Sequence, residues 1–298
     1  MNIYLKALRA PFLAGSLVPV IIGAAFALSS KTFSFWLLLL CAVGIAGLHL
    51  GANLLNDYFD ARGSDPINMR VTPFSGGSRA IQDGELAPRM VLFMALFFFA
   101  IGFTIGIWLI CLNRPLVIPI GLLGLGAGWA YSAPPLQLMS RGWGEAVIFF
   151  AFGPLVTLGT YYVMSGSLSW PAFAIGVPQG FFITGVIWIN QFPDYEADRS
   201  ANKRNLLVKL GPGYSRHLYC VIMSMAFVFV FFLIGVTGLS YMIMLPFMAF
   251  PLALKAMRIL WREYLSHTGI IPAQALTIQT LIAHGLLLSI GIALSRFI

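Results

Sequence analysis

About nine apolar runs, each of roughly 17–24 residues, follow one another along this chain of 298 residues. That is the length an α-helix needs to cross the hydrocarbon core of a bilayer. Only 9% of the residues are charged, against about 25% in soluble domains, so a water-soluble fold cannot cover this much apolar surface. Because backbone groups in lipid must bond within their own segment, the runs predict one all-α membrane domain over residues 1–298. The expected spans are Phe12–Leu28, Phe33–Leu55, Met90–Leu112, Pro115–Tyr131, Ala146–Val163, Pro171–Asn190, Leu218–Val236, Ser240–Leu254 and Ala273–Leu294.

Charge and cysteine usage exclude several other classes of protein. The net charge of +8 does not indicate a nucleic-acid partner, because the basic residues are scattered between apolar runs and form no polar module. The three cysteines, Cys41, Cys111 and Cys220, contain no Cys-x-x-Cys pair, which argues against a zinc site, a redox motif or a structural disulfide. The first residues show no small-residue cleavage site, so we do not expect a cleaved signal peptide.

The lysine and arginine residues predict the orientation in the membrane. If the N-terminus and the loops after the even-numbered spans share one side, the other side holds only three of the 18 basic residues, namely Lys31, Arg114 and Arg296. The positive-inside rule then places the N-terminus and those loops in the cytoplasm and the C-terminus outside. We expect a multi-pass protein of the cell's inner (cytoplasmic) membrane. All ten acidic residues also fall on the cytoplasmic side, which the rule does not require, so a function that needs negative charge is predicted there.

Two long polar segments on that side carry the candidate chemistry. Residues 53–86 follow the second span, and residues 190–211 follow the sixth. In the later segment Asn190, Asp194 and Asp198 recur at every fourth position, so a helix would present them on one face. A loop as long as the first exceeds what a connection requires and is typical of a functional segment.

The first polar segment repeats part of this pattern. Asn56 and Asp60 are also four residues apart, with Asp57 beside them and Asp65 further on. Like charges at this spacing repel, and burial near a membrane adds to the cost unless a cation compensates. Mg²⁺ prefers oxygen ligands and is held by one or two carboxylates together with phosphate oxygens. The two segments therefore predict a Mg²⁺ site that holds a diphosphate, with Asp57, Asp60, Asp194 and Asp198 as the catalytic carboxylates. The candidate metal ligands are Asn56, Asp57, Asp60, Asp65, Asn190, Asp194 and Asp198.

Basic residues in and near these segments can take the remaining phosphate charge. Arg70 lies among them in the first segment. Arg9 and Tyr131 lie at the ends of spans, where an arginine can be a positive-inside anchor and a tyrosine an ordinary interfacial residue. The candidate diphosphate ligands are Asn56, Arg62, Arg79, Tyr131, Lys203, Arg204 and Arg9.

One mechanistic interpretation is that the diphosphate is attached to an allylic prenyl chain. The metal and the basic residues would stabilise the departing diphosphate. The allylic cation left behind needs dry, electron-rich surroundings, and Trp188, Tyr161 and Tyr162 are candidates for cation–π contacts.

Three further features have both a functional and a structural interpretation. His49 lies inside the second span, one turn before Asn53, and is either a site residue or a partner of a neighbouring helix. Gly76-Gly77-Ser78 is either a flexible turn or a nest of backbone donors for phosphate. Glu145 is also explained as an ordinary carboxylate at a helix start.

Several motifs together resemble the UbiA superfamily of intramembrane aromatic prenyltransferases. From the first span to about residue 216 the chain contains, in order, NDYFD, GSD, GGSRAI, YSAPPL, GEAVIFFAFGPLVTLGTYYV and NQFPDYEADRSANKRNLLVKLG. The resemblance implies nine transmembrane helices around a central cavity capped by cytoplasmic loops, and Mg²⁺-dependent transfer of a polyprenyl group to an aromatic acceptor. The residues that match the two family motifs and the basic pair after them are Asn56, Asp57, Asp60, Asn190, Asp194, Asp198, Lys203 and Arg204.

Within the superfamily, the GSD, GGSR, GPL-x-x-x-GTYYV and NQFPDYEAD segments are most similar to the branch that prenylates 1,4-dihydroxy-2-naphthoate in menaquinone biosynthesis. This implies attack by the ring carbon that bears the carboxylate, with loss of CO₂, and Arg9 or Arg79 as holder of that carboxylate. The chain departs from the family pattern at two places. Asp65 stands one residue after the usual third aspartate, and Gln137 stands where a base often follows YSAPPL, with Arg141 the next base.

Two alternatives remain at this point. One is the same reaction with another acceptor, such as 4-hydroxybenzoate, a porphyrin alcohol precursor or haem. The other is a cation-coupled transporter or a Mg²⁺-binding membrane protein. Transporters usually hold their carboxylates near the midplane and often show inverted repeats, whereas the two motifs here lie at span ends in one orientation.

Overall fold

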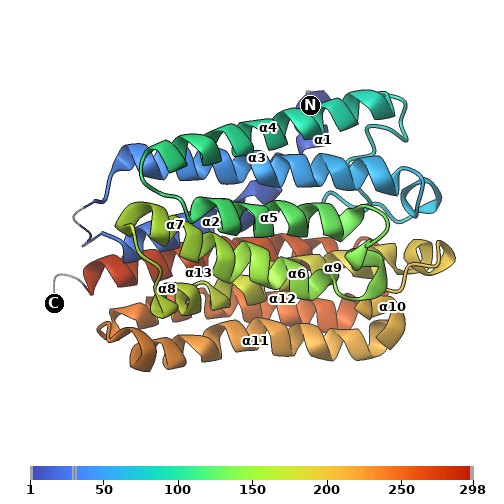
Figure 1. Cartoon of the computed structure of the whole chain (residues 1–298). Helices are drawn as coiled ribbons and strands as arrows, with labels where there is room; N and C mark the ends of the chain where they lie inside the picture. The colour runs from blue at the N-terminus through green and yellow to red at the C-terminus, as the bar shows by residue number, and fades with distance from the viewer. Residues whose placement is uncertain (1–2, 29, 31, 296–298) are drawn as a thin grey trace.

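The computed structural model describes residues 3–28, 30 and 32–295, and within them it contains helices and loops but no strand beyond an isolated bridge between Thr72 and Ser75. The long helices lie side by side with their axes roughly aligned (Figure 1). The prediction of an all-α membrane fold is confirmed. The helices are α1 (Ile3–Leu8), α2 (Ala14–Phe26), α3 (Phe35–Asp60), α4 (Pro88–Cys111), α5 (Val117–Ser132), α6 (Gly144–Phe150), α7 (Val156–Ser165), α8 (Trp170–Ile175), α9 (Val177–Ser200), α10 (Leu206–Leu210), α11 (Pro212–Thr237), α12 (Phe250–Glu263) and α13 (Ile271–Leu294).

Eight helical segments of the described chain are long and apolar enough to cross a membrane. Some of them join consecutive helices end to end: α6 continues into α7 through the π-helical turn η4 (Ala151–Leu155), and the 3₁₀ segment η5 (Tyr241–Ala249) continues into α12. The ninth segment is α5, whose 16 residues extend about 24 Å at 1.5 Å per residue. Each predicted span overlaps one of these nine segments of the described chain, so the predicted number of spans agrees with the structure.

Helix α9 lies at the centre of the bundle. In the most apolar 18-residue stretch of the segment Trp170–Ser200, formed by α8 and α9, 83% of the residues are buried, against 17% in the corresponding stretch of α4. Phe182, Trp188 and Ile189 of α9 are buried, and Trp188 donates its indole N–H to the carbonyl oxygen of Ser215 at 2.9 Å. The second Asn/Asp motif therefore extends from the most deeply buried helix of the bundle.

Helices α3 and α9 continue beyond their apolar parts. The hydropathy pattern predicts that these spans end at Leu55 and Asn190, but the helices end at Asp60 and Ser200. Their polar ends remain helical because the segment between α3 and α4, residues 61–87, covers them and supplies hydrogen-bond partners. We call this segment the cap. Both Asn/Asp motifs are thus helical and lie under the cap.

The cap is attached to the far side of the bundle by two hydrogen bonds. Arg70 donates to the carbonyl oxygen of Leu265 at 2.6 Å. His267 donates from Nε2 to the carbonyl oxygen of Val71 at 2.9 Å. Both partners lie in the loop between α12 and α13, so the cap crosses the end of the bundle and is held on both sides.

The described chain begins beside the cap and ends at the end of the bundle farthest from the cap. Lys6 of α1 forms ion pairs with Asp83 at 2.8 Å and Glu85 at 2.7 Å, which places α1 beside the cap. Helix α13 ends at the opposite end of the bundle (Figure 1). This arrangement agrees with an odd number of spans, and the cytoplasmic location of the cap stays a prediction.

Candidate active site

A cavity of about 400 Å³ runs from beneath the cap into the bundle. Its deep part is lined by apolar residues of α3, α4, α5 and the helix formed by α6, η4 and α7. Its outer part is polar and brings together both Asn/Asp motifs, so residues far apart in the sequence share one site. The polar side chains of this part are Arg9, Asn56, Asp60, Ser64, Asp65, Tyr131, Asn190, Gln191, Asp194, Asp198, Lys203 and Asn205.

Lys203 bridges the two motifs. Its ammonium nitrogen lies 3.0 Å from Oδ2 of Asp60 and 3.5 Å from Oδ1 of Asp198. The turn after α9 holds it there, because the Lys203 backbone N–H donates to the carbonyl oxygen of Asp198 at 2.9 Å. Burial alone would lower the pKa of Lys203, but the charges of Asp60 and Asp198 raise this pKa above its ordinary value. Lys203 is therefore a permanent positive charge between the two motifs.

The backbone of the GGSR segment also connects the motifs. The Ser78 N–H donates to both carboxylate oxygens of Asp57 at 3.3 Å, and the Gly76 N–H donates to Oδ2 of Asp194 at 3.3 Å. Gly76 and Gly77 both have positive φ, of 81° and 73°. A side chain at Gly77 would reach within 2.5 Å of Oδ2 of Asp65. This segment is thus neither a flexible turn nor a free nest, since its donors already hold carboxylates.

Asp65 lies in a short 3₁₀ turn of the cap and lines the cavity. It is buried, and its Oδ2 accepts a hydrogen bond from Gln82 at 3.3 Å. Burial, followed by the charges of Asp60 and Asp57, raises the pKa of Asp65 to about 7. The carboxylate that is displaced by one position in the sequence therefore still reaches the site.

Amide side chains complete the positioning of the carboxylates, and the sequence analysis missed them. Asn68 of the cap donates to Oδ1 of Asp194 at 2.7 Å, and Asn205 donates to Oδ2 of Asp198 at 2.8 Å. Gln274 of α13 donates to Oδ1 of Asn190 at 3.0 Å. Asn68 and Asn205 lie in the two polar segments already singled out, which was the available signal for them.

The donor set fits magnesium shared with a substrate. Within the described ranges, no three His, Cys, Asp or Glu side chains are grouped closely enough to hold a metal ion. Instead Asp60 and Asp65 line the cavity on one side, and Asp194 and Asp198 line it from α9. Mg²⁺ commonly keeps several waters and combines one or two carboxylates with phosphate oxygens. These oxygen donors are therefore suited to Mg²⁺ bound together with a diphosphate, rather than enclosed by protein alone.

Two other predicted diphosphate ligands lie at the cavity. Arg9 sits at the break between α1 and the 3₁₀ turn η1 (Ala10–Leu13), with a φ of 50°. Its guanidinium lies 3.8 Å from Oδ1 of Asp57 and stacks over the ring of Phe12. Tyr131, near the end of α5, lines the cavity as well. Both residues come from helix ends that meet beneath the cap.

Other predicted residues lie away from the cavity lining in the described structure. Arg62 and Arg79 belong to the cap, and Arg79 donates to the backbone carbonyl of Asp65 at 2.6 Å, which makes it a support for the site. The backbone N–H of Arg204 donates to the carbonyl oxygen of Ser140, beside a separate polar hollow.

The aromatic residues expected around the allylic cation also differ from those that line the cavity. Trp188 is in the core, Tyr162 accepts a hydrogen bond from the backbone of Leu116, and Tyr161 packs beside Phe26. The rings that line the cavity are Phe12, Phe74, Phe99, Phe103, Tyr131 and Phe152. Hydropathy alone cannot tell which face of an aromatic-rich helix borders a cavity.

The deep part of the cavity opens toward the outside of the bundle beside α5. Gly121 and Gly124 of α5 line it, and a side chain placed at either would meet no atom within 4 Å. Phe103 of α4 and Leu122 of α5 also line it and are 60% and 57% exposed. In a bilayer this opening would face lipid, so a long apolar chain can extend from the polar site into the membrane.

The comparisons with known proteins agree with this geometry. The profile described as the UbiA prenyltransferase family matches residues 16–268. A protein of Mycobacterium tuberculosis named 1,4-dihydroxy-2-naphthoate octaprenyltransferase is 31% identical, over 82% of this chain and 81% of its own. A solved structure of a UbiA homolog from Aeropyrum pernix has a TM-score of 0.72 at 16% identity and covers 99% of each chain. Another, a UbiA homolog from Archaeoglobus fulgidus bound to GPP and Mg²⁺, has a TM-score of 0.62 at 15% identity and covers 97% of this chain and 100% of its own.

Proposed function

Since this chain belongs to the UbiA prenyltransferase family, and is therefore a multi-pass membrane transferase, we propose that it transfers a polyprenyl group from an allylic diphosphate to 1,4-dihydroxy-2-naphthoate with Mg²⁺. The acceptor is supported by the similarity to the mycobacterial octaprenyltransferase of that name. We place the whole chain in one domain, with the cap on the cytoplasmic side of the inner membrane. Membership of a transferase family leaves the transporter hypothesis without support.

The observation that carries this proposal is the meeting of two polar helix ends over an apolar cavity. Asp60 and Asp65 on one side and Asp194 and Asp198 on the other would hold the magnesium. Bound Mg²⁺ would neutralise the diphosphate and so stabilise it as a leaving group. The separate polar hollow beside Arg204 has no carboxylate among the described residues that line it, so it does not offer the same combination.

Protein groups supply the rest of the electrostatic stabilisation. Lys203 and Arg9 carry positive charge at the polar end of the cavity and are positioned to contact diphosphate oxygens as the C1–O bond breaks. The apolar walls keep water away from the allylic cation, and the faces of Tyr131 and Phe152 offer it electron density. The chain thus promotes ionisation at one end of the cavity and protects the cation deeper inside.

The transfer is balanced without an oxidant or reductant. The C1–O bond breaks and the diphosphate leaves with the electron pair. The ring carbon that bears the carboxylate forms a bond to C1. The carboxylate then leaves as CO₂, and its electron pair restores the aromatic ring. With 4-hydroxybenzoate, a ring carbon next to the hydroxyl would lose a proton instead.

Membranes or purified protein supplied with labelled geranylgeranyl diphosphate and Mg²⁺ test the proposal. Dihydroxynaphthoate and 4-hydroxybenzoate are offered separately, with and without EDTA. EDTA-sensitive prenylation of the naphthoate alone is the expected result. Prenylation of the benzoate alone would keep the reaction and reject the acceptor.

Matched carboxylate variants test the site itself. Asp60→Asn and Asp194→Asn should each lower kcat by about 100-fold or more while leaving expression and folding intact. Asp83→Asn is the control, because Asp83 is an exposed carboxylate of the cap paired with Lys6, away from the cavity. If Asp60→Asn or Asp194→Asn retained near-normal turnover, the metal assignment would be rejected.

A further inference from the structure

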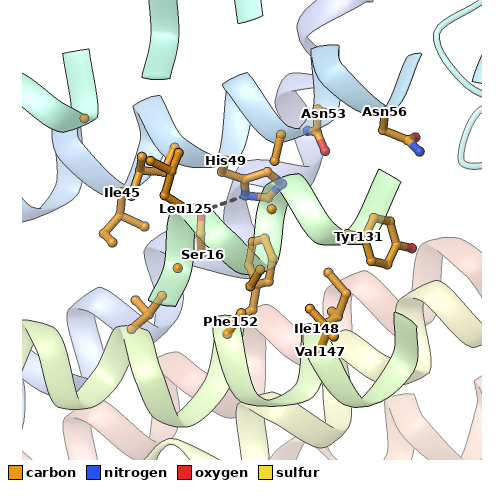
Figure 2. A pocket seen from close by; sticks show the side chains of 18 of the residues that line it. Ser16, Ile45, His49, Asn53, Asn56, Leu125, Tyr131, Val147, Ile148 and Phe152 are labelled. Carbon is orange, nitrogen blue, oxygen red and sulfur yellow. Dashed lines mark hydrogen bonds between the residues drawn. The ribbon is translucent and has the colours of Figure 1, made fainter. Parts of the chain in front are cut away.

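A row of polar side chains continues from the diphosphate end of the cavity into its apolar part. His49, Asn53, Asn56 and Asp60 occupy positions i, i+4, i+7 and i+11 of α3, which lie on one face of a helix, and all four line the cavity. Figure 2 shows His49, Asn53 and Asn56 following one another along α3. With a rise of 1.5 Å per residue, Asn53 lies about 4.5 Å and His49 about 10 Å deeper than Asn56. We call these four residues the polar row.

The tautomer of His49 is set by Ser16 of α2. The Ser16 hydroxyl lies 3.1 Å from the carbonyl oxygen of Leu13, to which it can donate, and 2.8 Å from Nδ1 of His49 (Figure 2). With its proton on the carbonyl, the hydroxyl accepts from Nδ1, and we assign this tautomer to His49. A neutral imidazole with its proton on Nδ1 has a free lone pair on Nε2. Within the described residues that nitrogen has no hydrogen-bond partner, and His49 lines the cavity. His49 is therefore prepared to accept one hydrogen bond from a molecule in the cavity.

Asn53 is the other unsatisfied member of the polar row. Its amide nitrogen is buried and has no partner among the described residues. Asn56 beside it donates to Asp60 and Ser132, each at 3.2 Å. Buried polar groups normally have partners, and an isoprenoid tail offers none. A prenyl tail would therefore leave Asn53 and His49 without hydrogen-bond partners. Both residues would be satisfied by a polar ligand bound at their level in the cavity.

The walls around these two residues suit a flat ring. The ring of Phe152 meets the His49 ring edge to face, with 4.9 Å between centroids and 76° between planes. Leu125 of α5 and Ile148 of α6 face the same hollow (Figure 2). An aromatic ring can pack edge to face against Phe152, and the aliphatic side chains offer apolar contact to its faces. The hollow thus combines apolar walls with two separated hydrogen-bonding groups.

We propose that His49 and Asn53 form the binding site of the acceptor ring, each bonding one of two hydroxyl groups on opposite sides of a dihydroxylated aromatic compound. This inference rests on the proposed function, because it locates the acceptor within the same cavity. The two residues are about 6 Å apart along the helix, comparable with the separation of hydroxyls across a ring. Ser16 is a positioning residue, since it acts only by fixing the His49 tautomer.

This position also favours the reaction. A hydroxyl that donates to Nε2 of His49 places more negative charge on its oxygen, which raises the electron density of the ring. The ring lies one to two helical turns below Asn56, so its reactive carbon can face the prenyl C1 beneath the diphosphate. No proton needs to leave the ring oxygen, because loss of CO₂ restores aromaticity.

Steady-state kinetics with Mg²⁺, geranylgeranyl diphosphate and 1,4-dihydroxy-2-naphthoate test the assignment. We expect Asn53→Ala and His49→Phe each to raise the KM of the naphthoate by about 5- to 20-fold, with the KM of the diphosphate changed by less than about 2-fold. The control is His284→Phe, because His284 is also a buried histidine that bonds an amide, Gln179, but lies outside the cavity lining. This control should change neither KM.

Methyl ethers of the acceptor separate binding from a merely structural role. Methylation removes the O–H that donates to His49 but leaves an ether oxygen that can still accept from Asn53, so as an inhibitor only one of the 1- and 4-methyl ethers should bind the wild type about 10-fold more weakly than the dihydroxy compound. His49→Phe should abolish this preference. An unchanged preference, an unchanged acceptor KM, or an equal rise in both KM values would overturn the inference. Failure of the wild type to prenylate any hydroxylated ring would instead reject the proposed function.

Discussion

At the scale of single residues, the site depends on backbone donors as much as on charged side chains. The N–H groups of Gly76 and Ser78 hold Asp194 and Asp57, one carboxylate from each motif. Gly77 lies between them, with a φ of 73° and no room for a side chain beside Asp65. The glycines of this segment are therefore required by geometry at the site and not by flexibility.

Gly77→Ala should disable the enzyme. Alanine in the left-handed conformation costs about 1–2 kcal/mol, and its Cβ would also displace the Asp65 carboxylate, whose Oδ2 it would approach to 2.5 Å. Gly84→Ala is the matched control, because Gly84 has a φ of 70° but open space around it. We expect both variants to lose thermal stability, with a larger loss in Gly77→Ala because of the contact with Asp65, and a large loss of kcat only in Gly77→Ala. Equal activity of the two variants would contradict the geometric account.

Asp65 gives the site a pH dependence. Burial, and then the charges of Asp60 and Asp57, raise its pKa to about 7, so the folded protein holds this proton more tightly than the unfolded chain. Without metal, the contribution of this carboxyl to the free energy of unfolding therefore decreases progressively as the pH rises from about 4 to about 7. Magnesium binding requires the ionised form and releases the proton.

We therefore expect the apparent Mg²⁺ affinity, measured with a prenyl diphosphate present, to weaken as the pH falls below about 7. Asp65→Asn should bind Mg²⁺ more weakly at pH 8 and show a flatter pH dependence. Titrations followed by thermal shift between about pH 6 and pH 8 would measure both. A pH dependence that is identical in the variant would assign it to another group.

At the scale of helices, local pattern predicted the spans but not their ends. Asn190, Asp194 and Asp198 repeat every fourth residue, so their common face could be inferred before the structure. The continuation of α9 to Ser200 could not, because hydropathy falls where the motif begins while the helix is maintained by partners in the cap. The bond from Gln274 to Asn190 joins helices distant in sequence, and nothing local signals it.

Arg70 shows that a basic residue in a polar segment can hold that segment in place instead of binding the substrate. It was expected to take phosphate charge, but its guanidinium bonds the carbonyl oxygen of Leu265 and holds the cap. Arg70→Ala should increase hydrogen exchange throughout residues 61–87 and raise the KM of the diphosphate by about 3- to 10-fold, since one charged hydrogen bond is lost. A raised KM with unchanged exchange in the cap would show instead that Arg70 contacts the phosphate directly.

At the scale of the whole molecule, the single-sided distribution of carboxylates is explained by the fold. The two motif-bearing helices end under one cap, and the cavity below them crosses much of the bundle thickness, from Asp60 to Leu40 along α3. The sequence could predict the charged end, because spacing and charge are local. It could not predict the opening beside α5, which depends on how α3, α4 and α5 pack.

That opening should determine how long a prenyl chain the enzyme accepts. Gly124 lines the deep cavity, and a side chain placed there would meet no atom within 4 Å, so Gly124→Leu would fill the passage without a clash. Turnover of geranyl diphosphate, the shortest of these donors, should change least. Turnover of donors with four or more isoprene units should fall progressively with length. The longer tail must either displace the new side chain or leave its apolar surroundings, and each CH₂ that loses its burial costs about 0.8 kcal/mol.

Gly126→Leu supplies the control for this substitution. Gly126 also has open space around it but lies outside the cavity lining, so a leucine there would point into lipid. Gly126→Leu should leave the preference for donor length unchanged, whereas Gly124→Leu should shift that preference toward shorter donors. If both variants treated all donors as the wild type does, the tail would have to leave the site by another route, and the opening between α4 and α5 would not be the path to the membrane.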